Sequence, residues 1–83
     1  MAENRYPAFD NAQKFIEIGY NIAYYRKHAG LTQEQLAAKA QLAGCDLTRS
    51  ALAKIECGQR SIYPDELKAL HEALHIPYES LLQ

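Results

Sequence analysis

Two stretches of the chain place polar side chains where a helix would present them to a ligand. Gly30-Leu31-Thr32-Gln33 opens one predicted helix, and Thr48-Arg49-Ser50-Ala51 opens another. An arginine offers paired donors that match the acceptors of guanine, and the short side chains beside it allow close approach to a base edge. The Gln33 amide and the backbone N–H groups at the same helix start can reach a phosphate. These residue types predict hydrogen bonding to nucleic acid.

Apolar spacing and capping residues predict the helices that hold these side chains. The first nine residues show no periodic pattern and predict an arm. Asp10, with Gln13 three positions later, predicts a capped helix start, and Gly30 suits the left-handed position after the end of that helix. The apolar residues between them recur at helical spacing and form one face: Phe15, Ile18, Ile22 and Tyr25. Tyr20 and Tyr24 lie off this face and are predicted to contact the arm or a partner.

Two shorter helices follow in the middle of the chain. Thr32 can cap the first of them, with Gln35 at the reciprocal position of a capping box. Gly44 is a natural stop for that helix, Thr48 is the next start signal, and Gly58 ends the second helix. The inner positions of these two helices are Leu36, Ala40, Ala43, Leu52 and Ile55.

Two prolines begin the last two helices. Pro64 fits a first helical position because its φ is already fixed, and Pro77 does the same for a short final helix. The inner face of the first of these helices comprises Leu67, Leu70 and Leu74, and the short final helix carries Leu81 and Leu82. Since no run alternates with a period of two, the sequence predicts an all-α fold of five helices, with an arm over residues 1–9 and a single domain over residues 10–83.

A helix followed by a second helix with a polar N-terminus has the geometry of a helix-turn-helix. The chain resembles the Cro/C1-type (Xre-type) repressors over roughly Ile18 to Leu82. The resemblance implies a five-helix, lambda-repressor-like domain that binds double-stranded DNA and regulates transcription, as a repressor and usually as a homodimer. The residues that carry it are Ile18-Gly19, Ile22, Arg26, Gly30-Leu31-Thr32-Gln33, Leu36-Ala37, Leu47-Thr48, Leu52, Ile55-Glu56, Gly58, Leu67, Leu70, Leu74 and Leu81-Leu82.

The resemblance also assigns roles to individual residues. It makes Gln33 a phosphate clamp and places Gln59 and Arg60 at the DNA backbone. It makes Arg26 and Glu56 a buried ion pair with a structural role. The face that reads the bases comprises Thr48, Arg49, Ser50, Ala51 and Lys54. Each of Gln33, Arg49, Lys54 and Arg60 has the alternative of being an ordinary solvated surface residue.

The chain departs from this family pattern between the two central helices. Gln41-Leu42-Ala43-Gly44-Cys45 is an insertion, and Asp46 replaces the usual glycine of the turn. Either the first of the two helices is about one turn longer, which would move its end by roughly 5.4 Å, or the turn is a longer loop. The individual base contacts depend on which alternative holds.

The net charge of −1 is unevenly distributed along the chain. Six basic and three acidic residues lie between Arg26 and Arg60, whereas one basic and four acidic residues lie between Ser61 and Gln83. The positive charge therefore coincides with the proposed nucleic-acid contacts. The insertion and the low net charge also favour a rival hypothesis, a helical interaction module or antirepressor that keeps the fold without reading DNA. For a homodimer, the candidate contacts are Tyr78, Leu81 and Leu82.

Other classes of protein find little support in the sequence. No nucleophile with its base, no carboxylate pair and no phosphate-binding loop can be assembled, so we expect neither an enzyme nor a small-molecule substrate. Cys45 and Cys57, with the three histidines, lack the spacing of a zinc site, so we expect no metal and no cofactor. Cys57 is predicted to be small and buried, while a redox role for Cys45 stays open. Two cysteines, no apolar spanning run and no signal peptide predict a cytoplasmic protein without a membrane partner, on the nucleoid when bound to DNA.

Overall fold

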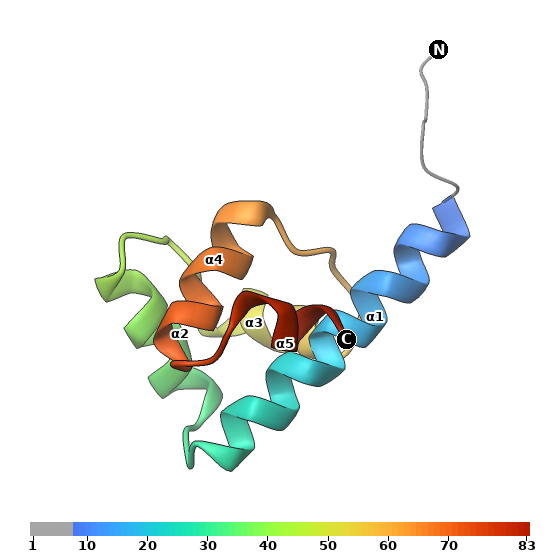
Figure 1. Cartoon of the computed structure of the whole chain (residues 1–83). Coiled ribbons are helices and arrows are strands. Elements are labelled where there is room, and N and C mark those ends of the chain that lie inside the picture. Colours follow the sequence, from blue (N-terminus) through green and yellow to red (C-terminus); the bar gives the residue numbers. More distant parts are fainter. Residues whose placement is uncertain (1–7) are drawn as a thin grey trace.

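The computed structural model describes residues 8–83, and within them every regular element is a helix (Figure 1). The predicted all-α fold of five helices is confirmed. Residues 1–7 of the expected arm lie outside the described residues. The helices are α1 (Ala8–His28), α2 (Gln33–Leu42), α3 (Arg49–Glu56), α4 (Pro64–Ala73) and α5 (Tyr78–Leu82).

The helix boundaries follow local capping chemistry. Thr32 accepts a hydrogen bond from the Gln35 N–H, and the Gln35 side chain accepts one from the Thr32 N–H, so the predicted capping box is present. Gly30 adopts a φ of 73° after α1, in the left-handed region that glycine enters without strain. The expected start of α1 at Asp10 is wrong, because α1 already begins at Ala8 and Asp10 lies inside it.

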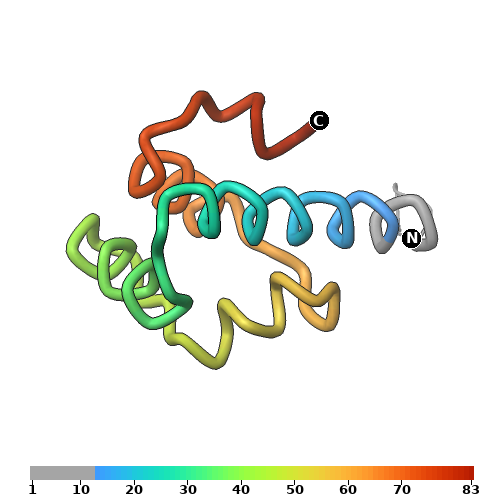
Figure 2. The backbone as a smooth tube through the Cα atoms, turned by 90° about the horizontal axis from the view of Figure 1, so that it is seen from below, coloured from blue at the N-terminus to red at the C-terminus, as the bar shows by residue number. Residues whose placement is uncertain are grey.

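The arrangement of the helices puts α1 at the centre of two separate contacts. Figure 2 shows α5 on one side of α1 and α3 on the other. Further contacts join α2 to α3 and to α4, and α4 to α5. None of the helices in residues 8–83 has the length and apolar character needed to cross a membrane.

The core draws on all five helices and on the link before α3. Its largest fully buried side chains are Ile22, Leu36, Leu47, Leu52, Ile55, Leu70 and Leu81. Two expectations are corrected here. Ala43 follows the end of α2 and is exposed, so it does not continue the inner face. Leu81 is fully buried within the single chain and cannot also serve as a dimer contact.

Gly19 sets the distance between α1 and α3. A Cβ atom at this position would overlap the carbonyl oxygen and carbon of Ile55, which belong to the backbone of α3 and cannot rotate away. The two backbones therefore approach so closely that only glycine fits. This contact determines how the C-terminal end of α3 lies against α1.

We predict that Gly19→Ala destabilises the fold by about 3 kcal/mol, the upper end of the usual cost of overpacking, because the added methyl group forces α1 away from α3. Gly30→Ala is the control. It introduces an unfavourable left-handed alanine costing about 1 kcal/mol, while nothing lies within 4 Å of the new Cβ. Urea unfolding of both variants measures the difference. Equal losses in the two variants would contradict the close approach.

Candidate nucleic-acid interface

The first turn of α3 presents the polar residues that the sequence assigns to base reading. Thr48 is the N-cap, and its Oγ1 accepts a hydrogen bond of 3.0 Å from the Ala51 N–H. Arg49, Ser50 and Lys54 are exposed, whereas Ala51 is half-buried and packs against the core. The structure therefore brings Thr48, Arg49, Ser50 and Lys54 onto the outer side of α3. Ala51 faces partly inward.

A shallow groove runs between α2 and the start of α3. It is lined by Glu34, Ala37, Ala38, Gln41, Thr48 and Arg49. Small alanines on α2 leave this space open beside the first turn of α3. Arg49 therefore borders a surface to which both helices contribute, as a helix-turn-helix requires.

The insertion both lengthens α2 and forms part of the turn after it, so it combines the two alternatives, a longer helix and a longer loop. Gln41 and Leu42 extend α2, and Ala43-Gly44-Cys45 makes the turn that follows. Gly44 has a φ of 93°, which confirms its predicted role as the helix stop. Neither the longer helix nor the longer loop alone describes the insertion.

The link between α2 and α3 is held at two points. The Cys45 N–H donates to the Ala40 carbonyl at 3.0 Å, and the Gln41 side-chain amide donates to the Leu47 carbonyl at 2.8 Å. Leu47 itself is fully buried. The inserted Gln41 thus fixes the residue that directly precedes the N-cap of α3. Sequence reasoning missed this role, because an exposed glutamine in an insertion carries no signal of its distant partner.

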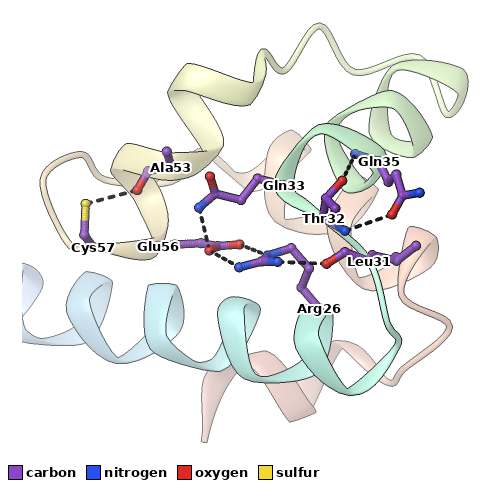
Figure 3. A network of polar contacts seen from close by, with 8 residues as sticks. All are labelled: Arg26, Leu31, Thr32, Gln33, Gln35, Ala53, Glu56 and Cys57. Atoms are coloured by element: carbon purple, nitrogen blue, oxygen red, sulfur yellow. Dashed lines mark hydrogen bonds and ion pairs between the residues drawn. The ribbon is translucent and has the colours of Figure 1, made fainter.

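Figure 3 shows the polar network that joins α1, α2 and α3. Arg26 binds Glu56 with two hydrogen bonds, from Nε to Oε2 at 2.7 Å and from Nη2 to Oε1 at 3.0 Å. The Arg26 Nη1 donates to the Leu31 carbonyl at 2.8 Å, just before α2. Both charged side chains are at least nine-tenths buried, at 10% and 6% exposure. The structure therefore brings the two residues of the expected ion pair together.

Gln33 joins the same network. Its Nε2 donates to Glu56 Oε1 at 3.0 Å, and the residue is half-buried at the start of α2. One amide N–H and the amide oxygen take no part in this bond. A phosphate contact by Gln33 would therefore use its second N–H or the backbone beside it, while the first N–H stays on Glu56.

We predict that Glu56→Ala costs about 3–5 kcal/mol of stability, because it leaves the buried Arg26 charge without a partner. The double variant Arg26→Met/Glu56→Leu should lose less than the single variant, since no buried charge remains. Thermal and urea unfolding compare them. A loss of about 1 kcal/mol or less for Glu56→Ala, the value of a surface pair, would show that the network is not a structural anchor.

Arg60, which the resemblance places at the DNA backbone, pairs with an acidic side chain of the same chain. Its Nη1 and Nη2 donate to the two carboxylate oxygens of Glu66 at 2.9 and 2.7 Å, and Nη1 also donates to the Ser61 carbonyl at 2.9 Å. The guanidinium carbon lies 5.2 Å from the centre of the Tyr63 ring. Arg60 therefore holds the segment between α3 and α4, while Gln59 beside it remains exposed.

Glu66 is the buried partner that the sequence analysis overlooked. Burial alone would raise the pKa of its carboxyl group, but the hydrogen bonds from Arg60 and from the Tyr63 N–H outweigh burial, and the pKa is lowered. Its position three residues after Tyr63, the N-cap of α4, was the available signal for a reciprocal cap. The Arg60–Glu66 pair is thus a second anchor, on the far side of the end of α3.

We predict that this pair makes stability depend on acidity. Because the Glu66 pKa is lower in the folded chain than its ordinary value of 4.5, the unfolded chain takes up the proton first. The stabilisation is complete above pH 4.5 and is lost as the pH falls below that value. As the pH is lowered through this interval, the free energy of unfolding measured by urea titration should fall less for Glu66→Gln than for the unmodified chain. Parallel curves for the two proteins would contradict the assignment.

One of the two cysteines, Cys57, is not in the environment that was expected. Cys57 is exposed rather than buried, and its thiol donates to the Ala53 carbonyl at 3.0 Å. Cys45 is buried, and burial raises the pKa of its thiol, so the reactive thiolate is disfavoured. A redox role for Cys45 therefore gains no support. Within the described residues, no three potential ligands among His, Cys, Asp and Glu gather as a metal site.

The geometry agrees with a comparison to known protein families. The family model described as helix-turn-helix matches residues 22–81. The chain belongs to the Cro/C1-type helix-turn-helix family. The family match supports a regulatory DNA-binding domain, so at the level of class this helix-turn-helix protein is a DNA-binding regulator of transcription.

Among solved structures, the helix-turn-helix chain is similar to the restriction-modification controller protein C.AhdI from Aeromonas hydrophila. The two are 29% identical, with a TM-score of 0.77, over 87% of this chain and 97% of C.AhdI. No curated protein matches the sequence.

Proposed function

We propose that this helix-turn-helix protein is a transcriptional repressor that binds a specific duplex sequence as a homodimer. The observation that carries the proposal is the first turn of α3, where Thr48, Arg49 and Ser50 stand exposed on a helix whose other end is anchored twice. A rigid helix with a free polar N-terminus is suited to the major groove. The similarity to a restriction-modification controller supports a regulatory role.

The roles of the side chains follow from their positions. Arg49 donates to the N7 and O6 acceptors of a guanine. Lys54, one and a half turns further along α3, contacts a phosphate, as does Gln59 beyond the helix end. At the start of α2, the backbone N–H groups and the second amide N–H of Gln33 bind another phosphate. These contacts orient the domain, and Arg49 supplies the discrimination between sequences.

A homodimer strengthens this binding. One domain offers few cationic contacts, because Arg26 and Arg60 are committed to Glu56 and Glu66. The affinity of one domain for DNA is accordingly modest, since phosphate neutralisation supplies much of it. Two domains on an inverted repeat double both the phosphate contacts and the bases that are read.

We predict that selection from a random duplex pool enriches one motif with inverted symmetry. Arg49→Ala should then lose about 1–3 kcal/mol of preference for that motif over unrelated DNA. Lys54→Ala is the matched control on the same helix, and it should weaken all sequences alike and reduce the salt dependence. Competition binding at two salt concentrations separates the two effects.

Two results would count against the proposal. If no motif is enriched and duplex binding does not depend on salt, the fold serves contacts with other proteins, as the rival hypothesis holds. If a motif is enriched but Arg49→Ala recognises it as the unmodified chain does, Arg49 is not the reading residue.

A further inference from the structure

The outer face of α1 carries a stripe of exposed apolar side chains, Ile16, Tyr20 and Tyr24, which we name the α1 stripe. Their exposed fractions are 48%, 69% and 46%. The residues lie four apart, so they follow one another along a single face of the helix. The opposite face of α1, with Ile18 and Ile22, is buried in the core. Ile16 lies beside Gly58 at the end of α3, but about half or more of each stripe side chain remains open to a partner.

Two shallow grooves flank Tyr20. One is lined by Ile16, Glu17, Tyr20, Asn21 and Gln83, and the other by Tyr20, Ala23, Tyr24, Lys27 and Glu56. Ala23 is small, so the second groove has room beside Tyr24 for a large side chain from outside. A protruding tyrosine next to such a groove is the shape of a surface that fits another helix.

Two residues of the stripe, Ile16 and Tyr20, precede the segment that the family model matches, whereas Tyr24 lies within it.

We propose that a second copy of this chain occupies the α1 stripe, with the two α1 helices antiparallel. Tyr20 and Tyr24 are centred on position 22, and so are Glu17 and Lys27. An antiparallel copy centred there places Tyr20 of each chain against Tyr24 of the other, beside the space that Ala23 leaves. The same register places Glu17 of each chain against Lys27 of the other. This inference names the surface of the homodimer in the proposed function and rests on it for its biological purpose.

The charges at the edge of the stripe are available for such pairing. Lys27 is exposed and forms no ion pair within the described residues. Glu17 has only a distant contact, with Lys14 Nζ at 3.9 Å, and accepts a weak hydrogen bond from Gln13 at 3.3 Å. Opposite charges on the rim select the antiparallel register, and the tyrosines at the centre supply most of the affinity.

The position of α3 makes this dimer compatible with one duplex. Gly19 touches α3, Asn21 donates to the Leu81 carbonyl of α5, and Tyr20 lies between them. Figure 2 shows α3 and α5 on opposite sides of α1, and at about 100° per residue the stripe faces between them. The twofold axis of antiparallel helices is perpendicular to both and to the line joining them, so it points from α5 towards α3. Both copies of α3 then lie on the same side of the dimer.

Sedimentation equilibrium without DNA, over a wide range of protein concentrations, tests the surface. The unmodified chain should form a dimer, and Tyr20→Lys should raise its dissociation constant about tenfold or more, because a central aromatic contact is replaced by like charges. Leu42→Lys is the matched control, since Leu42 is an exposed apolar residue of α2 outside the stripe, at 89% exposure. It should leave the dissociation constant unchanged.

A charge exchange tests the register independently. Glu17→Lys and Lys27→Glu should each weaken the dimer, because each places like charges opposite one another, and the double variant should restore it. Circular dichroism confirms that every variant remains folded. A monomer at all concentrations would overturn the proposal. A dimer that is indifferent to Tyr20→Lys, or a double variant weaker than both single variants, would do so as well.

The failure of this inference is distinguishable from failure of the proposed function. A monomeric chain that still enriches a DNA motif leaves the regulator in place and removes only the α1 contact. If the dimer follows the Tyr20 and charge-exchange predictions but enriches no motif, the α1 interface is supported and sequence-specific DNA binding is rejected.

Discussion

The buried carboxylate of Glu56 is the constraint on which the arrangement of the three N-terminal helices depends. It accepts two hydrogen bonds from Arg26 near the end of α1 and one from Gln33 at the start of α2, while it is itself the last residue of α3. Removing two charges from water is costly, and here the two-pronged geometry and the additional donor offset that cost. One carboxylate therefore fixes the relative directions of α1, α2 and α3.

The opposite ends of α3 have different mechanical roles. At its C-terminal end, Gly19 lets α1 approach the backbone, and just beyond the helix Arg60 is held by Glu66. At its N-terminal end, Gln41 secures the Leu47 carbonyl, but Arg49 and Ser50 project freely. The helix is held at the end opposite its exposed polar turn. This division leaves the polar residues accessible without involving them in the core.

Local signals in the sequence predicted the helices well, whereas tertiary neighbours decided the rest. The Thr32–Gln35 box and the stop at Gly44 depend on residues close in sequence, and both are present. The choice of Leu81 as a dimer contact and the expected burial of Cys57 were wrong, because each depends on how the helices pack in three dimensions. The partner of Arg26, thirty residues away, was available only through resemblance to a family. The reading of bases by Arg49 stays a prediction.

The link before α3 bears on how such a protein can diverge. Cys45 and Leu47 are buried, so the inserted segment has become part of the core and its length is no longer free to drift. Arg49 and Ser50, a few residues later, are exposed, so they can be substituted without disturbing the core. Substitutions at these two positions can therefore alter the exposed surface of α3 on an unchanged scaffold, whereas changes to the link disturb the core.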